Sequence, residues 1–300
     1  MDSFSPFDPK GLARLKTLKL RAKRLVSGML LGEHPGRRQG VSAEFIDHRP
    51  WESGNDPQKI DWRVYARTGK FFQRRYQEQA TAGVTFLLDY SASMDYRGKN
   101  APLSKKEYLE SLAAAMGYLV TRQQDSLGMM AYRACETVVF RAGTGEKHWW
   151  DSLAFLENPP FSKKTSHDVT SDILATYAEQ FPKHGMVFWI GDFFDREDFA
   201  QTLPLLKRLC ARGDEITLLQ IADPDEIEFP FDSLNRFVSL ENPQENVTLS
   251  AANVRQAYLE AWENWCGEIR NGCRKLNIPH FLCSTQESLE VCLRKVLVSF

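Results

Sequence analysis

The sequence contains no long apolar run. Its apolar stretches, such as residues 186–190, are far shorter than the roughly 18 residues that cross a membrane as a helix. The first ten residues also lack the apolar centre of a signal peptide. From these two absences we expect a cytoplasmic protein with no transmembrane segment.

Neither sign of charge is in excess, and cysteine pairs of the C-x-x-C type are absent. The chain has 38 Lys and Arg against 39 Asp and Glu, a formal net charge of -1, so it lacks the global basic field that holds nucleic acid. Its six cysteines are better explained as free buried thiols than as a redox motif. Hydrophobic residues make up 43% and charged residues 26%, which is the composition of a folded rather than a disordered protein.

The first 40 residues carry a local excess of positive charge. Nine basic residues stand against three acidic ones, and leucines recur at near-helical spacing, so residues 9–27 are predicted to form a basic amphipathic helix. We expect this helix to pack on its own domain, and docking on acidic lipid or on an acidic partner is the alternative. We therefore divide the chain into an N-terminal extension over residues 1–80, packed on the domain, and a domain over residues 81–300.

From residue 83 onward, apolar strands alternate with helical stretches. Strands are predicted over 83–89, 126–132, 186–192, 215–223 and 278–284, with an edge strand over 137–143. Helices are predicted over 105–122, 197–212 and 250–276, near 147–156 and 170–181, and at the C-terminal end. This alternation predicts an α/β fold, with a doubly wound, mostly parallel sheet and helices on both of its faces.

The strands predicted over 83–89 and 186–192 end in an acidic residue, Asp89 and Asp192. Ligands of open α/β sheets lie beyond the carboxyl ends of the strands. Asp89 begins the string D-Y-S-A-S, in which Asp89, Ser91 and Ser93 place one carboxylate and two hydroxyls in a single loop. Such hard oxygen ligands suit Mg²⁺ or Mn²⁺, and Asp192 would join them directly or through water. The alternative is that Asp89 and Ser91 only cap the loop and the helix that follows it.

The string DYSASM after a buried strand resembles the metal-ion-dependent adhesion site of von Willebrand factor A domains. The upstream segment HRPWESGNDPQKIDWRVYARTGKFFQRRYQEQ resembles a more specific pattern, that of the bacterial family called domain of unknown function 58. The residues that match this pattern are Arg49, Pro50, Gly54, Asp56, Ile60, Asp61, Trp62, Ala66 and Arg67. With DSLGMMAY and WIGDFFD further along the chain, the resemblance covers about residues 30–225.

The resemblance implies a von Willebrand factor A-like fold and a function in protein–protein interaction. A hard cation at Asp89 would leave one position open for an acidic side chain of a protein partner. Relatives of this family look like companions of MoxR-type AAA+ ATPases, which implies a role in the assembly or maturation of other proteins. The segment 47–76 is expected to be structural or partner-facing through Arg49, Asp56, Asp61, Trp62 and Arg67.

One part of the adhesion-site pattern departs from the family. A further ligand, normally a threonine, comes from a loop that here has the sequence KKTSHDVTSDIL, and the family's triplet falls on residues 167–169. Thr165 could serve only if the loop shifts, while His167 as a ligand would favour a transition metal over Mg²⁺. Weak metal binding and an empty site both stay open at this point, and Asp89, Ser91 and Ser93 are better supported than any residue of this loop.

Three other functions are less well supported. A Mg²⁺-dependent hydrolase or phosphatase of the haloacid dehalogenase type could use Asp89 and Asp192, but Ser91 stands where its general acid should be. The string GTGEK over 143–147 does not match a phosphate-binding loop. Basic and aromatic residues interleave over 62–76, but the neutral overall charge argues against nucleic-acid binding. We therefore expect a binding protein and not an enzyme.

Overall fold

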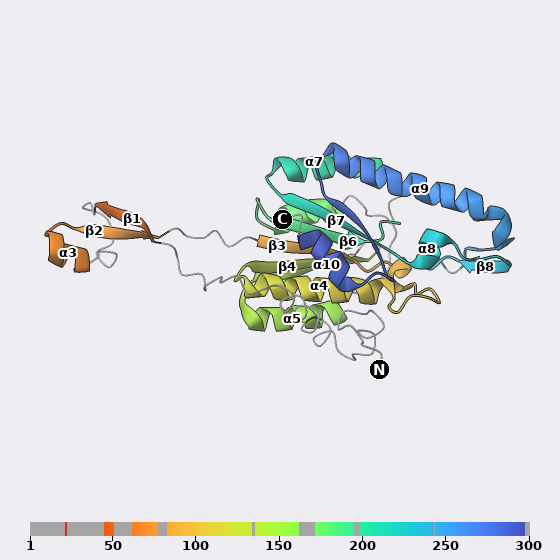
Figure 1. Ribbon diagram of the computed structural model, residues 1–300, viewed down its shortest axis with the longest axis horizontal. Helices are drawn as coiled ribbons and strands as arrows, with labels where there is room; N and C mark the ends of the chain where they lie inside the picture. The colour runs from red at the N-terminus through yellow and green to blue at the C-terminus, as the bar shows by residue number, and fades with distance from the viewer. Residues whose placement is uncertain are drawn as a thin grey trace. The chain divides into compact units, whose positions relative to one another are not determined.

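The computed structural model describes residue 22 and the ranges 45–50, 62–76, 83–133, 136–161, 172–194, 199–242 and 244–297 (Figure 1). The chain forms two compact units, of which one is Glu33–Thr81 and the other combines Met1–Gly32 with Ala82–Phe300. The predicted basic helix over 9–27 lies outside the described residues except for Ala22, which is helical and buried. Packing of the N-terminal extension on the domain stays a prediction.

The larger unit is built on a six-stranded sheet with the strand order β10-β7-β6-β3-β4-β5. All neighbouring strands are parallel except β4 and β5, which are antiparallel. The strand bounds are β3 Gly83–Asp89, β4 Ser126–Arg133, β5 Glu136–Gly143, β6 Met186–Gly191, β7 Glu215–Ala222 and β10 His280–Ser284. The inner strands are almost continuously apolar because a parallel sheet covered on both faces buries every side chain.

Helices cover both faces of this sheet (Figure 1). One face packs against α4 Lys105–Arg122, α5 Gly145–Glu157 and α10 Leu289–Leu297. The other packs against α6 Asp172–Gln180, α7 Leu203–Ala211 and α9 Ala251–Lys275. Strand β3 contributes side chains to the hydrophobic cores on both faces of the sheet. Phe86 and Leu88 pack on the first face and Leu87 on the second, because successive side chains of a strand point to opposite faces. The predicted α/β fold class is confirmed.

Helix α4 starts where its sequence provides a cap. The Ser104 hydroxyl accepts a hydrogen bond from the Glu107 backbone N–H, and the Glu107 carboxylate accepts one from the Ser104 N–H. This reciprocal pair satisfies two backbone donors that the first turn of a helix leaves open. The helix therefore begins at Lys105, and residues 96–104 connect it to the D-x-S-x-S loop and its short helix η2, Ala92–Asp95.

A two-stranded hairpin that the sequence analysis did not predict lies between β7 and α9. It pairs β8 Leu234–Val238 with β9 Asn246–Ser250 in antiparallel register and follows the short helix α8 Pro224–Glu228. Phe237 of β8 stacks on Phe229, and Phe229 stacks on Tyr258 of α9, with ring centroids 5.7 Å and 4.3 Å apart. These aromatic contacts fix the base of the hairpin on the domain.

In the smaller unit, β1 Phe45–Pro50 pairs antiparallel with β2 Phe72–Tyr76, and α3 Trp62–Thr68 precedes β2. Tyr65 stacks on Phe71 with ring centroids 4.5 Å apart, and Trp62 meets Tyr65 edge-on. Trp62, Tyr65 and Phe71 therefore contact one another within the smaller unit, and the choice between a structural and a partner-facing role stays a prediction. Trp62 nevertheless keeps 59% of its surface exposed.

Candidate functional site

The candidate site lies where the order of the strands reverses. Strands β3 and β6 are neighbours at the centre of the sheet, yet the chain runs outward from β3 to β4 and in the opposite direction from β6 to β7. Such a switch point is where open α/β sheets bind ligands. Asp89 is the last residue of β3 and Asp192 directly follows β6, so both expected acids lie at this point.

Asp89 is fully buried against the backbone of the neighbouring strand. A Cβ atom at Gly191 of β6 would lie 2.7 Å from Cβ and 2.8 Å from Oδ2 of Asp89. The absence of a side chain at Gly191 therefore gives the Asp89 carboxylate the room that it occupies. Its other oxygen, Oδ1, accepts a hydrogen bond of 2.8 Å from the Ser91 backbone N–H, which turns the chain back over the carboxylate.

The two serine hydroxyls of the D-x-S-x-S loop converge. Ser91 Oγ and Ser93 Oγ lie 3.0 Å apart, within hydrogen-bonding distance of each other, and the Ser91 N–H of the same loop donates to the Asp89 carboxylate. Adjacent oxygens on one octahedral Mg²⁺, with bonds of about 2.1 Å, are separated by about 3.0 Å. The spacing of the hydroxyls and the carboxylate beside them thus fit a small hard cation.

Asp192 is held differently, because its partner is a buried lysine. Lys105 Nζ donates to Asp192 Oδ2 at 2.7 Å and to Glu226 Oε1 at 2.5 Å, and the Phe194 N–H donates to Asp192 Oδ1 at 3.0 Å. Lys105 has no exposed surface, and its ammonium also lies 4.8 Å from the centre of the Phe194 ring. These contacts account for one bond to each Asp192 oxygen, and its role as a ligand, directly or through water, stays a prediction.

Opposing effects set the charge of this buried lysine. Burial alone would lower the pKa of the Lys105 ammonium, but the charges of Asp192 and Glu226 outweigh burial and raise that pKa above its ordinary value. Burial raises the pKa of Glu226, although Lys105 opposes this effect. The neighbouring carboxylates therefore favour the charged form of the lysine at the carboxyl end of β6.

Two more acids at this edge escaped the sequence analysis. Asp223 follows β7 as Asp89 and Asp192 follow their strands, and this third strand-end acid could have been recognised. Its Oδ2 accepts from the Gly98 N–H at 2.9 Å and from the Thr285 hydroxyl at 3.3 Å. A Cβ at Gly98 would lie 2.3 Å from Asp223 Oδ1, so this close contact requires glycine. Asp223 thereby ties the loop before α4 to the ends of β7 and β10.

The second of these acids is Glu241, in the turn of the β8–β9 hairpin. Its Oε1 accepts a hydrogen bond of 2.9 Å from the Ser93 backbone N–H. The two residues are 148 positions apart in the sequence, and no sequence pattern links them. The hairpin turn therefore contacts the D-x-S-x-S loop itself.

The other expected site residues lie either outside the described ranges or in the smaller unit. Thr165 and His167 lie outside the described ranges, as do Asp56 and Asp61. Arg49 pairs through its backbone with Gln73 in the smaller unit, where Trp62 and Arg67 are exposed on α3. No cluster of three or more His, Cys, Asp or Glu side chains able to hold a metal occurs in the described ranges, so a cation at Asp89 would depend on the serine hydroxyls.

A cleft of about 390 Å³ borders the D-x-S-x-S loop. It is lined by Tyr90, Ala92 and Asp95 from the loop and by Lys106, Arg133, Glu157, Asn158, Pro159 and Phe161. Arg133 lies over the Phe161 ring at 4.7 Å, and Lys106 over the Tyr90 ring at 5.7 Å. The cleft thus offers aromatic surface together with charges of both signs.

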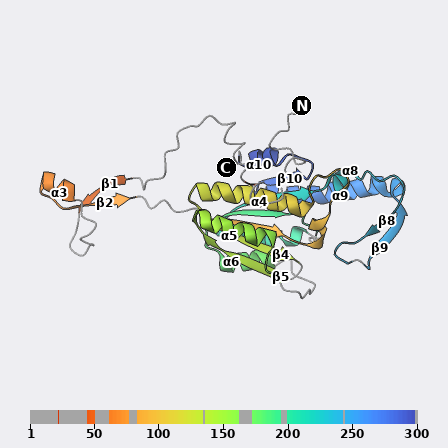
Figure 2. The same cartoon turned by 90° about the horizontal axis from the view of Figure 1, so that it is seen from below.

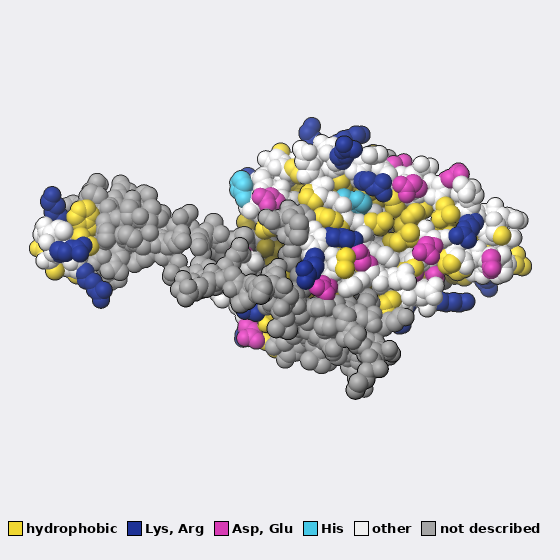
Figure 3. Space-filling view, viewed as in Figure 1, with side chains coloured by type: hydrophobic (Ala, Val, Ile, Leu, Met, Phe, Trp, Pro, Cys, Tyr) yellow, Lys and Arg dark blue, Asp and Glu magenta, His cyan; other side chains and the backbone are white. Residues whose placement is uncertain are grey.

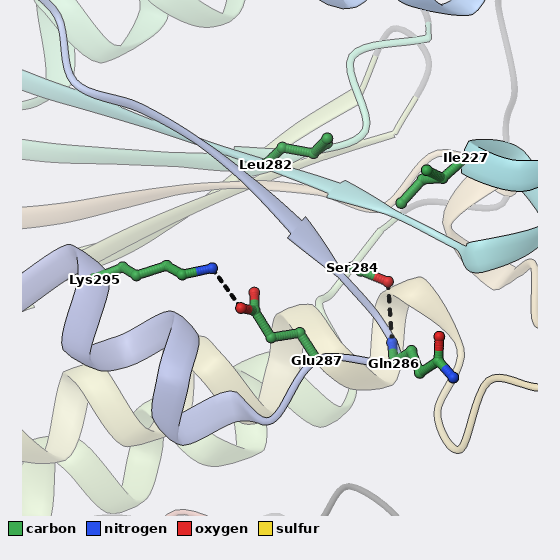
Figure 4. A pocket seen from close by; sticks show the side chains of 6 residues that line it. All are labelled: Ile227, Leu282, Ser284, Gln286, Glu287 and Lys295. Carbon is green, nitrogen blue, oxygen red and sulfur yellow. Dashed lines mark hydrogen bonds and ion pairs between the residues drawn. The ribbon is translucent and has the colours of Figure 1, made fainter. Parts of the chain in front are cut away.

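A second cavity of about 440 Å³ lies at the outer strand β10 and is lined by Ile227, Leu282, Ser284, Gln286, Glu287 and Lys295 (Figure 4). Glu287 and Lys295 form an ion pair with each other, and the Gln286 N–H donates to the Ser284 hydroxyl. Strands β7 and β6 separate β10 from β3. Because its charged groups already satisfy each other, this cavity is the weaker candidate.

The site can now be compared with known proteins. The family model described as "Protein of unknown function DUF58" matches residues 47–264. The chain belongs to the DUF58 family. The resemblance seen in the sequence is thereby confirmed, and the DUF58 match includes the Asp89 loop, Asp192, Lys105 and the β8–β9 hairpin.

Curated proteins similar to this chain include the uncharacterized proteins Mb1516 of Mycobacterium bovis and Rv1480 of Mycobacterium tuberculosis. Each is 28% identical over 226 residues, which cover 74% of this chain and 68% of the relative. Among solved structures, the conserved hypothetical protein BatB from Bacteroides thetaiotaomicron is 16% identical with a TM-score of 0.48, covering 73% of this chain and 98% of BatB. The SpRpn10 VWA domain is 12% identical with a TM-score of 0.40, covering 72% of this chain and 95% of that domain.

Two general expectations concern membranes and nucleic acid. Within the described ranges, no helix has both the length and the apolar character needed to cross a membrane. On the face seen in Figure 3, basic and acidic side chains of the larger unit are interspersed, and its described residues form no large patch of one sign. This surface agrees with the balanced charge of the sequence.

Proposed function

We propose that the chain is a von Willebrand factor A-like interaction module that binds an acidic side chain of a protein partner through a hard cation at the Asp89 loop. The observation that carries the proposal is the 3.0 Å approach of the Ser91 and Ser93 hydroxyls beside the buried Asp89 carboxylate, at the switch point of the sheet. The ion, Mg²⁺ or Mn²⁺, would be held by these three residues.

The bound cation would supply a positive centre that accepts the partner's carboxylate as a ligand. The chain's own contribution is to orient the hydroxyls and to bury the Asp89 carboxylate. Because the carboxylate is buried, its charge is only weakly screened and attracts a cation more strongly than it would in water. The Ser93 N–H is a further hydrogen-bond donor at the loop and is able to hold a carboxylate, as its bond to Glu241 shows. Charge-assisted bonds of this kind give a carboxylate partner both affinity and direction.

The cleft beside the loop supports a protein partner. The acidic side chain would enter at Ser93, while neighbouring residues of the partner pack against Tyr90, Phe161 and the charges of Lys106 and Arg133. The family resemblance leads us to propose a MoxR-type AAA+ ATPase in the cytoplasm as this partner, with a role in assembly or maturation of other proteins.

We propose binding rather than catalysis at this site. The hydrolase alternative needs a general acid beside Asp89, and Ser91 stands there. It also needs Asp192 for its metal ion, and Lys105 donates to that carboxylate. Hydrolysis of p-nitrophenyl phosphate by the wild-type protein, lost in Asp89→Asn, would revive the hydrolase alternative.

The test measures Mn²⁺ binding by calorimetry in the full chain. Asp89→Asn and the double variant Ser91→Ala/Ser93→Ala should each weaken Mn²⁺ binding by at least about tenfold, because each removes cation ligands. Asp232→Asn removes an equivalent charge from an exposed position and should bind Mn²⁺ as the wild type does. Absence of Mn²⁺ binding by the wild type, or an unchanged affinity in Asp89→Asn, would contradict the proposal.

The partner is tested separately with a purified MoxR-type ATPase. Immobilised wild-type chain should retain it in Mg²⁺ and release it in EDTA, and Asp89→Asn should not retain it in Mg²⁺. Equal retention in all three arms would place recognition outside the Asp89 loop.

A further inference from the structure

The turn of the β8–β9 hairpin has a defined shape, which places Glu241 at a fixed position. The Ser239 N–H donates to the Glu245 carbonyl at 2.9 Å, and the Asn242 N–H donates to the Ser239 hydroxyl at 3.1 Å. The Asn242 side chain also donates to Glu245 Oε1 at 2.8 Å. These bonds hold described residues on both sides of Glu241, and with them the position of its carboxylate.

The hairpin is fixed to the site at its base as well. Tyr258, which stacks on Phe229 below the hairpin, donates its hydroxyl to the Glu226 carbonyl at 3.0 Å. The Glu226 carboxylate accepts from Lys105, which in turn donates to Asp192. Figures 1 and 2 both place the hairpin at the end of the sheet where the loop after β3 lies. Its turn is therefore held over the carboxyl edge.

At this edge the Glu241 carboxylate lies where an incoming acid would have to lie. Its Oε1 is 2.9 Å from the backbone nitrogen of Ser93, whose hydroxyl is one of the three oxygens assigned to the cation. The Ser93 N–H can serve only one carboxylate at full strength. A second acid and Glu241 therefore exclude each other.

We propose that Glu241 is an internal carboxylate ligand of the Asp89 loop, so that the β8–β9 hairpin closes the site until the acidic side chain of a partner displaces it. The inference rests on the proposed function, since it assigns the regulation of the same site. It also defines the partner's chemistry as a carboxylate on a flexible side chain, the group that the hairpin itself offers.

Opening of the hairpin requires little loss of buried surface. Apolar residues of the hairpin are already exposed, namely Leu234 at 72%, Val238 and Leu240 at 46% and Val247 at 51%. The contact at its turn is a hydrogen bond of an exposed side chain, which solvent weakens. The turn can thus leave the loop while the aromatic base stays in place.

The test uses sodium glutarate as the carboxylate probe and the full chain in Mg²⁺, with selective ¹⁵N-serine labelling to follow the Ser93 amide by NMR. Three proteins are compared, the wild type, Glu241→Ala and the matched control Asp232→Ala. If Glu241 occupies the position about nine-tenths of the time, its removal lowers the half-saturating glutarate concentration about tenfold. Asp232→Ala removes the same charge from the approach to the hairpin and should titrate like the wild type.

Equal half-saturation in all three proteins would overturn the inference, as would a Ser93 amide that glutarate shifts in none of them. Mn²⁺ calorimetry on the same proteins separates this failure from that of the proposed function. If the proteins bind Mn²⁺ but titrate equally with glutarate, the cation site is supported and Glu241 does not compete for it. If Glu241→Ala binds glutarate more tightly but no protein binds Mn²⁺, competition by Glu241 is supported and the proposed cation site is contradicted.

Discussion

The ammonium of Lys105 lies 2.7 Å from Oδ2 of Asp192, and neither side chain has more than 1% of its surface exposed. The same ammonium contacts Glu226, so a single buried cation faces two carboxylates at the carboxyl edge of the sheet. A buried charge that loses its partner costs far more than a pair adds when it is complete. Lys105 should therefore be the most sensitive charged position of the domain.

Substitution of Lys105 by methionine keeps the side-chain volume and removes the charge. It leaves Asp192 and Glu226 without their cation, and we expect the free energy of unfolding to fall by about 3–5 kcal/mol. Urea denaturation followed by circular dichroism measures this loss. Lys106→Met is the control, because Lys106 pairs with the exposed Asp95 at 3.4 Å and should change stability by less than about 1 kcal/mol. A Lys105→Met variant as stable as the control would refute the role of the buried cation.

Gly191→Ala tests whether the space left by the absent side chain of Gly191 positions the Asp89 carboxylate. The new Cβ would lie 2.8 Å from Asp89 Oδ2, so the carboxylate has to move out of line with the serine hydroxyls. We expect Mn²⁺ affinity to drop by at least about tenfold in calorimetry. Gly83→Ala at the other end of β3, where an added Cβ meets nothing within 4 Å, should leave Mn²⁺ binding unchanged. Equal affinities would show that Asp89 does not set the site.

Gly98→Ala tests the clamp made by Asp223. Its Cβ would overlap Asp223 Oδ1 at 2.3 Å, so the loop must shift, and we expect a loss of about 1–3 kcal/mol of stability. Gly267→Ala on α9 is the contrast, because nothing lies within 4 Å of its Cβ and helical alanine gains about 0.8–1 kcal/mol over glycine. Thermal melting should therefore move in opposite directions for the two variants. A Gly98→Ala protein that melts at or above the wild-type temperature would contradict the clamp.

His280 should make stability depend on pH. Burial, followed by the charge of Arg270, lowers the pKa of His280 from 6.5 to about 4. Between these two pKa values His280 is protonated in the unfolded chain but not in the folded one. The free energy of unfolding therefore falls as the pH drops from about 6.5 toward 4, and it levels off below that. The loss amounts to about 3 kcal/mol.

The comparison is between wild type and His280→Gln, by urea denaturation at pH 7 and at a pH near 4.5. Both proteins share the titration of the remaining groups, so the difference between their pH slopes isolates His280. The wild type should lose more stability than the variant over this interval. Parallel slopes would mean that His280 titrates in the folded chain near its ordinary pKa.

Sequence patterns were sufficient for the elements with a strong period or a strong cap. The apolar run of β3 and the helical period of α4 predicted both elements with their observed bounds, Gly83–Asp89 and Lys105–Arg122. The hairpin β8–β9 was missed because its two strands have only five residues each and are mostly exposed, which is too short a pattern to distinguish from a loop. Helix α3 was missed for a similar reason, since it has no buried residue.

The candidate site was predictable only where its residues are contiguous. Asp89, Ser91 and Ser93 belong to one loop, so their convergence follows from the strand end and the spacing. Lys105 and Asp192 are 87 positions apart, and Ser93 and Glu241 are 148 apart. Such pairs depend on the order of the strands in the sheet, which local patterns do not contain.

The hydrogen bonds of Asp223, the clamp on the loop before α4, also determine at which stage of synthesis the site can form. It joins Gly98, which is 125 positions earlier, with Thr285, which is 62 positions later. Synthesis from the N-terminus therefore delivers the D-x-S-x-S loop long before the groups that shape it. A nascent chain that ends before Asp223 carries the loop without its clamp, and one that ends before Thr285 has only the Gly98 half of it.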